Sequence, residues 1–257
     1  MRILVTNDDG IYADGLNVLY RELSELGECV VVAPETEQSA VGHAITLYRP
    51  IMVRRARKDG EFLGYAVRGT PADCVKIGVK ELTEKPVDLV VSGINVGANV
   101  GINVLYSGTV SAATEAAILG IPAIAVSLDT RTSSSNFIPA ARFIKKLIPQ
   151  VMESSFLRGV TLNVNVPALP EEEIRGAVIT RQGAARLVEE FERRLDPRGN
   201  IYYWLAGETL LPDTEELESD ACALSRGYIT ITPINYDLTR HSAVEGVRTA
   251  LSALISS

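Results

Sequence analysis

The first 35 residues place one amphipathic run between two short apolar runs, and this order restricts the fold more than any other feature. "RILVT" (2–6) and "CVVVAPE" (29–35) are apolar stretches of strand length. "GLNVLYRELSELG" (15–27) carries apolar residues at helical spacing, and Gly27 is suited to end a helix there. A strand, a helix and a second strand in this order predict an α/β fold with a parallel sheet.

The same alternation continues to about residue 180. Between residues 45 and 69, two strand-like runs flank a Lys-Asp-Gly turn, which predicts a hairpin beside the main sheet. Thr70 followed by Pro71 predicts a helix start. The other elements expected in this part are strands at 87–95, 121–128 and 161–167 and helices at 106–120 and 141–152.

We expect one domain over residues 1–257, with a catalytic core over 1–180 and an extension over 181–257, where the alternation weakens. Within the extension, "IYYWLAGE" (201–208) contains the only tryptophan and is a candidate aromatic hairpin. The remaining expectations there are a strand at 227–234 and a helix at 243–255.

Charge and cysteine content exclude several classes of protein. The net charge of −7 argues against a general nucleic-acid binder, which normally shows a basic face. The three cysteines, Cys29, Cys74 and Cys222, are widely spaced and predict reduced thiols in a cytoplasmic protein. We find neither a signal peptide nor a run of the ~20 apolar residues that spans a bilayer, so we expect no membrane partner.

Polar residues gather directly after the apolar strands. Asp8 and Asp9 follow the first strand, "PETEQSAVGH" (34–43) follows the second, and "SGINVGANVG" (92–101) follows the strand expected at 87–95. The carboxyl ends of parallel strands lie at one edge of the sheet, where ligand sites form. The three segments are therefore expected to meet in one crevice.

The adjacent carboxylates of Asp8 and Asp9 favour a metal site. An Asp-Gly turn alone would be the simpler interpretation. A divalent cation, however, turns the repulsion between two neighbouring acids into shared coordination. Because no histidine or cysteine lies nearby in the sequence, an oxygen-only ligand set is expected, and that set favours Mg²⁺ or Mn²⁺ over zinc.

Two further segments could hold a ligand. Asn95, Asn99 and Asn103 recur among glycines in one loop, which is either a close-approach loop or a flexible connector. Ser107 can cap a helix whose first N–H groups, including those of Gly108 and Thr109, would then form an anion site, or it can serve as a cap alone. The common dinucleotide and P-loop fingerprints are absent from the sequence.

Ser39 and His43 are weaker candidates, because a loop serine or histidine is as readily a capping or solvated residue. His43 could reach the crevice as a general acid. Nucleophilic acyl chemistry has little support, since the sequence lacks a G-x-S-x-G elbow.

Seven motifs occur here in one order: "TNDDG", "APETEQSA", "GTPADCV", "DLVVSGINVGANVG", "YSGTVSAATEA", "NVNVP" and "GYITITPI". In this combination the chain resembles the SurE (survival protein E) family of metal-dependent 5′-nucleotidases. The resemblance covers essentially the whole chain, and only residues 181–225 carry no recognised family pattern.

The resemblance implies a Rossmann-like three-layer core, a mostly parallel sheet and a C-terminal extension used in oligomerisation. It implies hydrolysis of nucleoside 5′-monophosphates to nucleoside and phosphate, with 3′-nucleotides and short polyphosphate as further substrates in some relatives. It also implies one divalent cation per subunit, Mg²⁺ or Mn²⁺, and a homodimer or homotetramer with exchanged C-terminal segments.

The family's functional residues match positions of this chain. Its metal ligands match Asp8, Asp9, Ser39 and Asn95, and the first two are also the expected catalytic residues. Its phosphate-binding segment matches Ser107, Gly108 and Thr109, and we place Asn99 with the substrate as well.

Three other functions are weighed against this one. An aspartyl-phosphate mechanism uses two acids two residues apart, whereas the acids here are adjacent. A non-catalytic nucleotide or metal sensor would be favoured by missing ligands, but all four matched positions are intact. A nicotinamide-dependent oxidoreductase is suggested only by the alternation of strands and helices.

Overall fold

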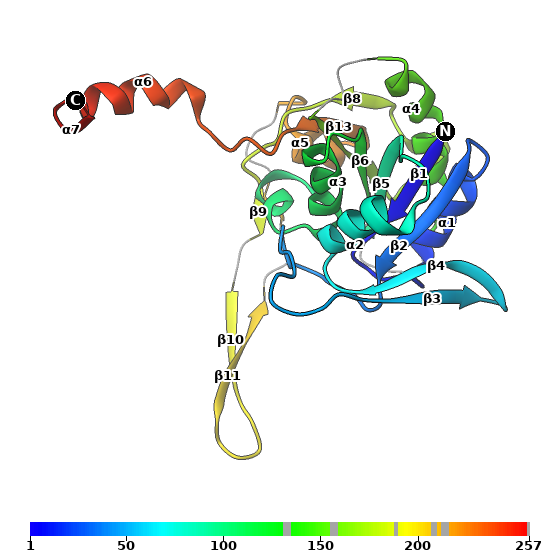
Figure 1. The fold of residues 1–257 in the computed structure, drawn as a ribbon. Helices are drawn as coiled ribbons and strands as arrows, with labels where there is room; N and C mark the ends of the chain where they lie inside the picture. Colours follow the sequence, from blue (N-terminus) through cyan, green and yellow to red (C-terminus); the bar gives the residue numbers. More distant parts are fainter. Residues whose placement is uncertain (131–134, 155–158, 188–189, 207–209, 212–215, 256–257) are drawn as a thin grey trace.

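The protein is built around one large sheet, shown in Figure 1 as a computed structural model. The structure describes residues 1–130, 135–154, 159–187, 190–206, 210–211 and 216–255. Within these residues the main sheet has nine strands in the order β3-β4-β2-β1-β5-β6-β7-β13-β8. They are β1 (Arg2–Thr6), β2 (Glu28–Pro34), β3 (Met52–Lys58), β4 (Glu61–Arg68), β5 (Leu89–Val96), β6 (Ala123–Asp129), β7 (Thr161–Pro167), β8 (Ala177–Ile179) and β13 (Ile229–Ile234).

Six neighbouring strands of this sheet are parallel, from β4 through β2, β1, β5 and β6 to β7. The expected hairpin over 45–69 forms from β3 and β4, which pair antiparallel and extend the sheet beyond β2. At the other side, β13 pairs antiparallel with β7. The predicted α/β fold with a mostly parallel sheet is confirmed.

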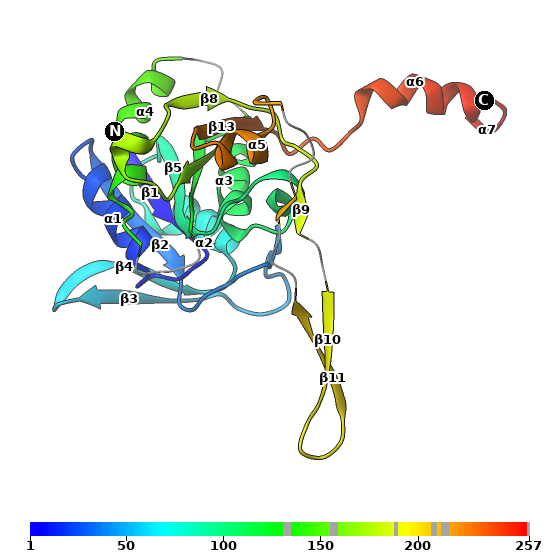
Figure 2. The ribbon, with the colours of Figure 1, turned by 180° about the vertical axis from the view of Figure 1, so that it is seen from behind.

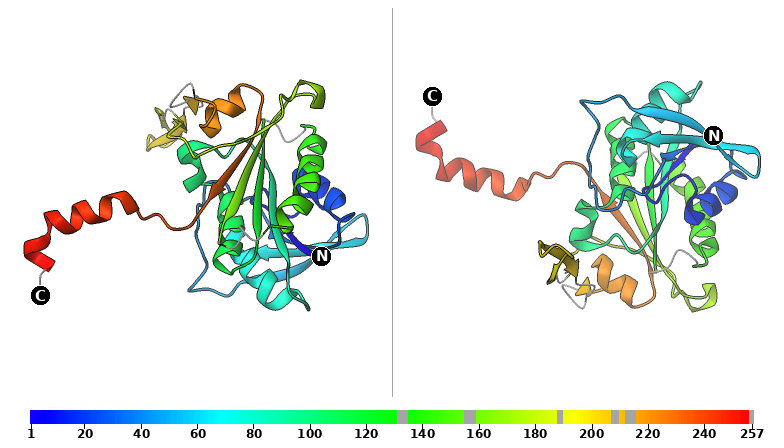
Figure 3. Two further views of the ribbon diagram at one scale, coloured as in Figure 1. Left: turned by 90° about the horizontal axis from the view of Figure 1, so that it is seen from above. Right: turned by 90° about the horizontal axis from the view of Figure 1, so that it is seen from below.

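Helices cover both faces of the sheet and give three layers, as Figure 3 shows. Ile3 and Val5 of β1 are in a core cluster with α1 and α4, whereas Leu4 is in a second cluster with α2 and α3. This alternation along one strand is expected for a strand buried on both faces. The helices are α1 (Asp14–Leu23), α2 (Pro71–Ile77), α3 (Gly108–Ile118), α4 (Ile138–Met152), α5 (Asp220–Ser225), α6 (His241–Ala250) and α7 (Ser252–Ile255), with a π-helix at Gly78–Leu82 and 3₁₀ turns at Gly101–Leu105 and Glu171–Glu173.

One helix start was predicted well and one helix end was not. Thr70 caps α2 in a full capping box with Asp73, and Pro71 is its first residue. The expectation that Gly27 ends the first helix is wrong, because α1 ends at Leu23. Gly27 has a packing role instead: a Cβ there would lie 2.2 Å from the carbonyl oxygen of Met1.

Two segments project from the three-layer body. Figure 2 shows the hairpin of β10 (Glu190–Leu195) and β11 (Ile201–Ala206) extending in one direction and α6 in another. Two short strands, β9 (Arg186–Leu187) and β12 (Leu210–Leu211), pair between the hairpin and the body. Because β13 lies in the main sheet, the predicted boundary at residue 180 does not coincide with the edge of that sheet. No helix in the described part of the chain is long and apolar enough to cross a membrane.

Candidate functional site

The segments that follow β1 and β2 are joined where both strands end. The Gln38 N–H donates to the carbonyl oxygen of Asp8 at 2.8 Å, and the Ile11 N–H donates to that of Pro34 at 2.9 Å. Asn7 closes the turn by accepting from the Gly10 N–H and donating to the Gly10 carbonyl. The expected meeting of these two segments at the carboxyl edge of the sheet is therefore observed.

The start of α3 lies directly against Asp8. The Thr109 hydroxyl donates to Asp8 Oδ1, and its backbone N–H also bonds to this carboxyl group. A Cβ on Gly108 would lie 2.7 Å from Asp8 Cβ and 2.8 Å from Asp8 Oδ2, so glycine is required for this approach. Burial raises the pKa of Asp8, although the bonds from Thr109 oppose that rise.

Fewer N–H groups in the first turn of α3 are free to bind an anion than the sequence analysis expected. Ser107 caps the helix as expected, because its hydroxyl accepts from the Val110 N–H at 3.1 Å. The Thr109 N–H is engaged by Asp8, so the Gly108 N–H is the first-turn donor left for an anion. The positive end of the helix dipole is also directed at this place.

Asp9 is the second carboxylate of the pair. Burial, the charge of Asp8 and the charge of Glu37 together raise its pKa from 3.8 to about 7, while a hydrogen bond from the Val96 backbone opposes the rise. Val96 is the last residue of β5, so the carboxyl end of this strand also reaches the pair. The protein thus concentrates negative charge where no basic side chain neutralises it in the described residues.

Glu37 is a member of this site that the sequence analysis missed. Its Oε1 accepts from the Ser39 hydroxyl at 2.5 Å, and its charge acts on both Asp8 and Asp9. The signal was an acid two residues before Ser39, in a segment already expected at the crevice. Ser39 itself is exposed at this edge.

Asn95 and Asn99 occupy different surroundings. Asn95 is half-buried, and its Nδ2 donates to the Gly97 carbonyl at 2.8 Å, which leaves Oδ1 as an acceptor. Asn99 is buried, and its Nδ2 donates to the Ser127 hydroxyl at 2.8 Å. The backbone of Asn99 is held as well, since its N–H donates to Asn165 Oδ1. These bonds use the Asn99 amide for support of the loop.

His43 is paired away from the carboxylates. Its Nε2 lies 2.9 Å from Glu115 Oε2, and Lys76 Nζ lies 2.6 Å from the other oxygen of Glu115. Burial alone would raise the pKa of Glu115, but these hydrogen bonds and positive charges lower it. Glu115 is ~10 Å along α3 from Gly108, so this pair attaches the loop that carries Ser39 to α3.

The donor set can hold a hard cation. The oxygen donors are the carboxylates of buried Asp8 and half-buried Asp9, the free Oδ1 of Asn95 and the hydroxyl of Ser39. Oxygen donors suit Mg²⁺ and Mn²⁺. In the described part of the chain, no group of three or more His, Cys, Asp or Glu residues forms a metal cluster. The neutral oxygens would therefore have to complete the coordination.

Fold and site together define an α/β protein with a carboxylate pair below a helix N-terminus, at the carboxyl edge of a parallel sheet. The family model described as "Survival protein SurE" matches residues 3–189. A protein of Syntrophus aciditrophicus named "5'-nucleotidase SurE" is 63% identical over 98% of this chain and 94% of its own length. One of Syntrophobacter fumaroxidans with the same name is 54% identical over 95% of this chain and 97% of its own.

The fold has a close counterpart among solved structures. The crystal structure of the SurE protein from Aquifex aeolicus matches with a TM-score of 0.84 and 39% identity, covering 97% of this chain and 99% of the other. The chain belongs to the SurE family.

Proposed function

We propose that this chain is a divalent-metal-dependent 5′-nucleotidase that hydrolyses nucleoside 5′-monophosphates to nucleoside and phosphate. The observation that carries the proposal is the Asp8–Asp9 pair packed against the N-terminus of α3, in a chain whose near relatives are named 5′-nucleotidases. Those names favour a catalytic protein over a nucleotide or metal sensor. Short polyphosphate and 3′-nucleotides are further candidate substrates.

One divalent cation per subunit, Mg²⁺ or Mn²⁺, would be held by Asp8, Asp9, Ser39 and Asn95. When bound, it supplies positive charge that neutralises a phosphate and makes a water more acidic. The buried carboxylates with raised pKa values support this assignment, because a cation compensates the repulsion that burial intensifies.

The start of α3 would receive the phosphate. Gly108 contributes its N–H and, by lacking a side chain, lets the helix approach Asp8. Thr109 orients Asp8 through its hydroxyl and backbone N–H. Ser107 keeps the first turn in place by capping it. Phosphoryl transfer needs mainly positioning and charge stabilisation, and this arrangement offers both.

Phosphate release from 5′-AMP tests the proposal directly. Protein stripped with EDTA is expected to release none, and addition of Mg²⁺ or Mn²⁺ is expected to restore release in the wild type but not in Asp8→Asn. Release by the stripped protein, or equal release by the variant, would remove the metal assignment. Absence of release from AMP, 3′-AMP and polyphosphate would leave the sensor as the leading hypothesis.

Metal affinity is expected to rise with pH through about 7. The folded pKa of Asp9 is about 7, so protons compete with the cation below that pH. Well below pH 7 the affinity should fall about tenfold per pH unit while one proton leaves for each ion bound. Calorimetric titration of stripped protein with Mn²⁺ at several pH values measures this slope, and a flat profile between about pH 6 and 8 would contradict the prediction.

We propose in addition that the two projecting segments contact a second copy of the chain. The β10–β11 hairpin exposes Phe191, Tyr203, Trp204 and Leu205, each more than half accessible. Neither an isolated two-stranded hairpin nor an isolated 10-residue helix such as α6 is stable alone in water. A homodimer or homotetramer with these segments exchanged would cover them. The free Cys29, Cys74 and Cys222 fit assembly in the reducing cytoplasm.

Replacing Trp204 with Asp is expected to reduce the oligomer to a smaller species. A charged side chain in place of Trp204 would oppose burial of this part of the hairpin between subunits. Light scattering coupled to size exclusion measures the mass, with Lys85→Asp on an exposed loop as the control. An unchanged mass for Trp204→Asp would exclude the hairpin from the interface.

A further inference from the structure

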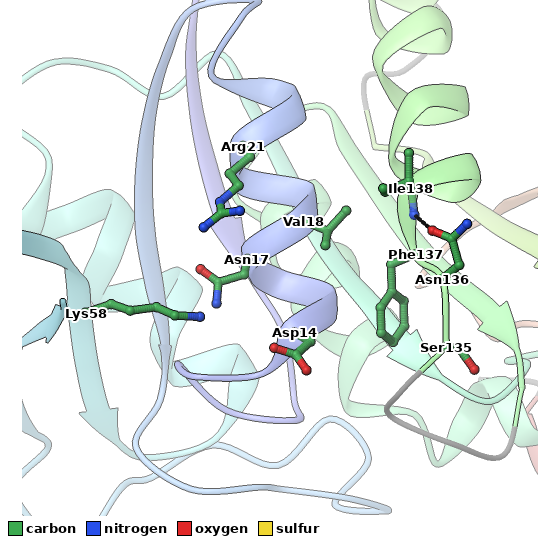
Figure 4. Close-up of a pocket in the computed structure, with 9 residues that line it drawn as sticks. All are labelled: Asp14, Asn17, Val18, Arg21, Lys58, Ser135, Asn136, Phe137 and Ile138. Carbon is green, nitrogen blue, oxygen red and sulfur yellow. Dashed lines mark hydrogen bonds between the residues drawn. The ribbon is translucent and has the colours of Figure 1, made fainter.

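A cavity of about 320 Å³ lies across one face of α1, between the end of β3 and the start of α4. Figure 4 shows its lining, with Lys58 on one side of α1 and Ser135 to Ile138 on the other. None of the residues that line it belongs to the carboxylate site described above. They are Asp14, Asn17, Val18, Arg21, Lys58, Ser135, Asn136, Phe137 and Ile138.

The α1 residues of this cavity form one stripe of the helix. Asp14 and Arg21 are each three or four positions from both Asn17 and Val18, so the four side chains leave the helix on the same side. Asn17 is 8% exposed, and its buried Nδ2 has no hydrogen-bond partner. Figure 4 shows the Asn17 amide directed away from the helix toward the Lys58 ammonium. A buried donor without a partner is costly, which points to a ligand that accepts from it.

Two cations of the cavity also lack partners. In the part of the chain that the structure describes, neither Arg21 nor Lys58 makes an ion pair or a side-chain hydrogen bond. Lys145 on α4 shows the alternative, since it contacts both Glu22 and Glu25 of α1. Unpaired cations beside an unpaired amide donor form a site for an oxyanion.

The remaining lining indicates more than a bare anion. The volume is at the small end of ligand pockets and exceeds what inorganic phosphate fills. Val18 and Phe137 supply an apolar wall, while the carboxylate of Asp14 can accept from a hydroxyl group. A dianionic phosphate would bind the cations of Arg21 and Lys58. A hydroxylated body attached to it would fill the rest of the volume and donate to Asp14.

We propose that this cavity is a second binding site, separate from the metal site, for a small phosphate monoester with a hydroxylated body. A nucleotide and a sugar phosphate share this chemistry. The cavity is connected to the carboxylate site through α1, which begins at Asp14, five residues after Asp9. An occupied cavity can therefore act on the position of the carboxylate pair.

The test is calorimetric binding to the full-length, metal-free protein, so it does not depend on hydrolysis. AMP, ribose 5-phosphate, inorganic phosphate and adenosine are titrated separately. Arg21→Gln and Lys58→Gln are expected to raise the Kd of the phosphate monoesters about tenfold each. Arg57→Gln removes the same charge from the adjoining position of β3, which does not line the cavity, and should leave the Kd unchanged.

The four ligands identify the source of the phosphate and the decisive outcomes. Binding of both monoesters supports a general phosphate site, and binding of AMP alone supports a nucleotide site. Equal Kd values for the wild type, Arg21→Gln and Lys58→Gln would overturn the proposal. So would tighter binding of adenosine than of AMP, or no binding of either monoester to the wild type. Thermal melts of the variants check that the fold is retained.

Discussion

Replacing Asp9 with Asn is expected to lower kcat/KM for AMP hydrolysis by about a thousandfold or more, because one of the two charged metal ligands is lost. The same change is expected to stabilise the metal-free protein at neutral and alkaline pH. In the folded chain the pKa of Asp9 is raised to about 7, so the charged form is disfavoured there. The wild type therefore loses stability as the pH rises from 3.8 through about 7, and the uncharged amide removes this loss.

Asp9→Asn is expected to lower activity but to raise the stability of the metal-free protein. This combination distinguishes a metal ligand from a structural residue. Activity is measured with saturating Mn²⁺, and thermal melting is measured after EDTA treatment at about pH 6 and pH 8. Asp59→Asn, in the exposed turn between β3 and β4, is the control for removal of one negative charge. An Asp9→Asn protein that is both inactive and less stable would indicate a structural role for Asp9 instead of a metal-binding one.

Replacing Gly108 with Ala is expected to lower kcat/KM for AMP hydrolysis by about a hundredfold, although no charge or polar group is removed. The new methyl group would lie 2.7 Å from Asp8 Cβ and 2.8 Å from Asp8 Oδ2, too close for either residue to remain in place. Asp8 or the start of α3 must then move, and with it the Thr109 contact that orients the carboxylate. Steady-state kinetics and Mn²⁺ titration of the variant measure both consequences.

Gly246→Ala is the matched control for this substitution. Gly246 lies in α6, and within one subunit a Cβ there meets no atom within 4 Å. Alanine also has the higher helix propensity, so this variant should keep full activity. Wild-type activity and metal affinity in Gly108→Ala would show that the α3 N-terminus can move without affecting the site.

The sequence predicted the elements of the parallel sheet well because each buried strand carries its own signal. "RILVT" is short and apolar and forms β1, and "TLNVNVP" alternates aliphatic residues with asparagines and forms β7. Thr70 and Pro71 located the start of α2 by capping chemistry, which acts over only four residues. Gly27 misled because its role depends on Met1, which is 26 positions earlier and lies beside it where the parallel strands β1 and β2 begin.

In the candidate site, too, local features could be predicted from the sequence and contacts between remote residues could not. The adjacent acids and their position after a strand were readable in the sequence, and so was Ser107 as a helix cap. Glu37 was missed because its part in the site depends on a turn that brings it beside Asp8 and Asp9. The pairing of His43 with Glu115 was missed as well, since the two residues are 72 positions apart and no local pattern links them.

By itself the sequence determined the α/β class, the order of strands and helices and the carboxylate pair at the end of β1, because these features depend on neighbouring residues. Only the tertiary structure decided which groups meet the pair. The hydrogen bond from Thr109 to Asp8 joins residues 101 positions apart, and the raised pKa of Asp9 depends on burial by several segments. Burial and distance between remote residues arise from packing, and packing is set by the whole chain at once.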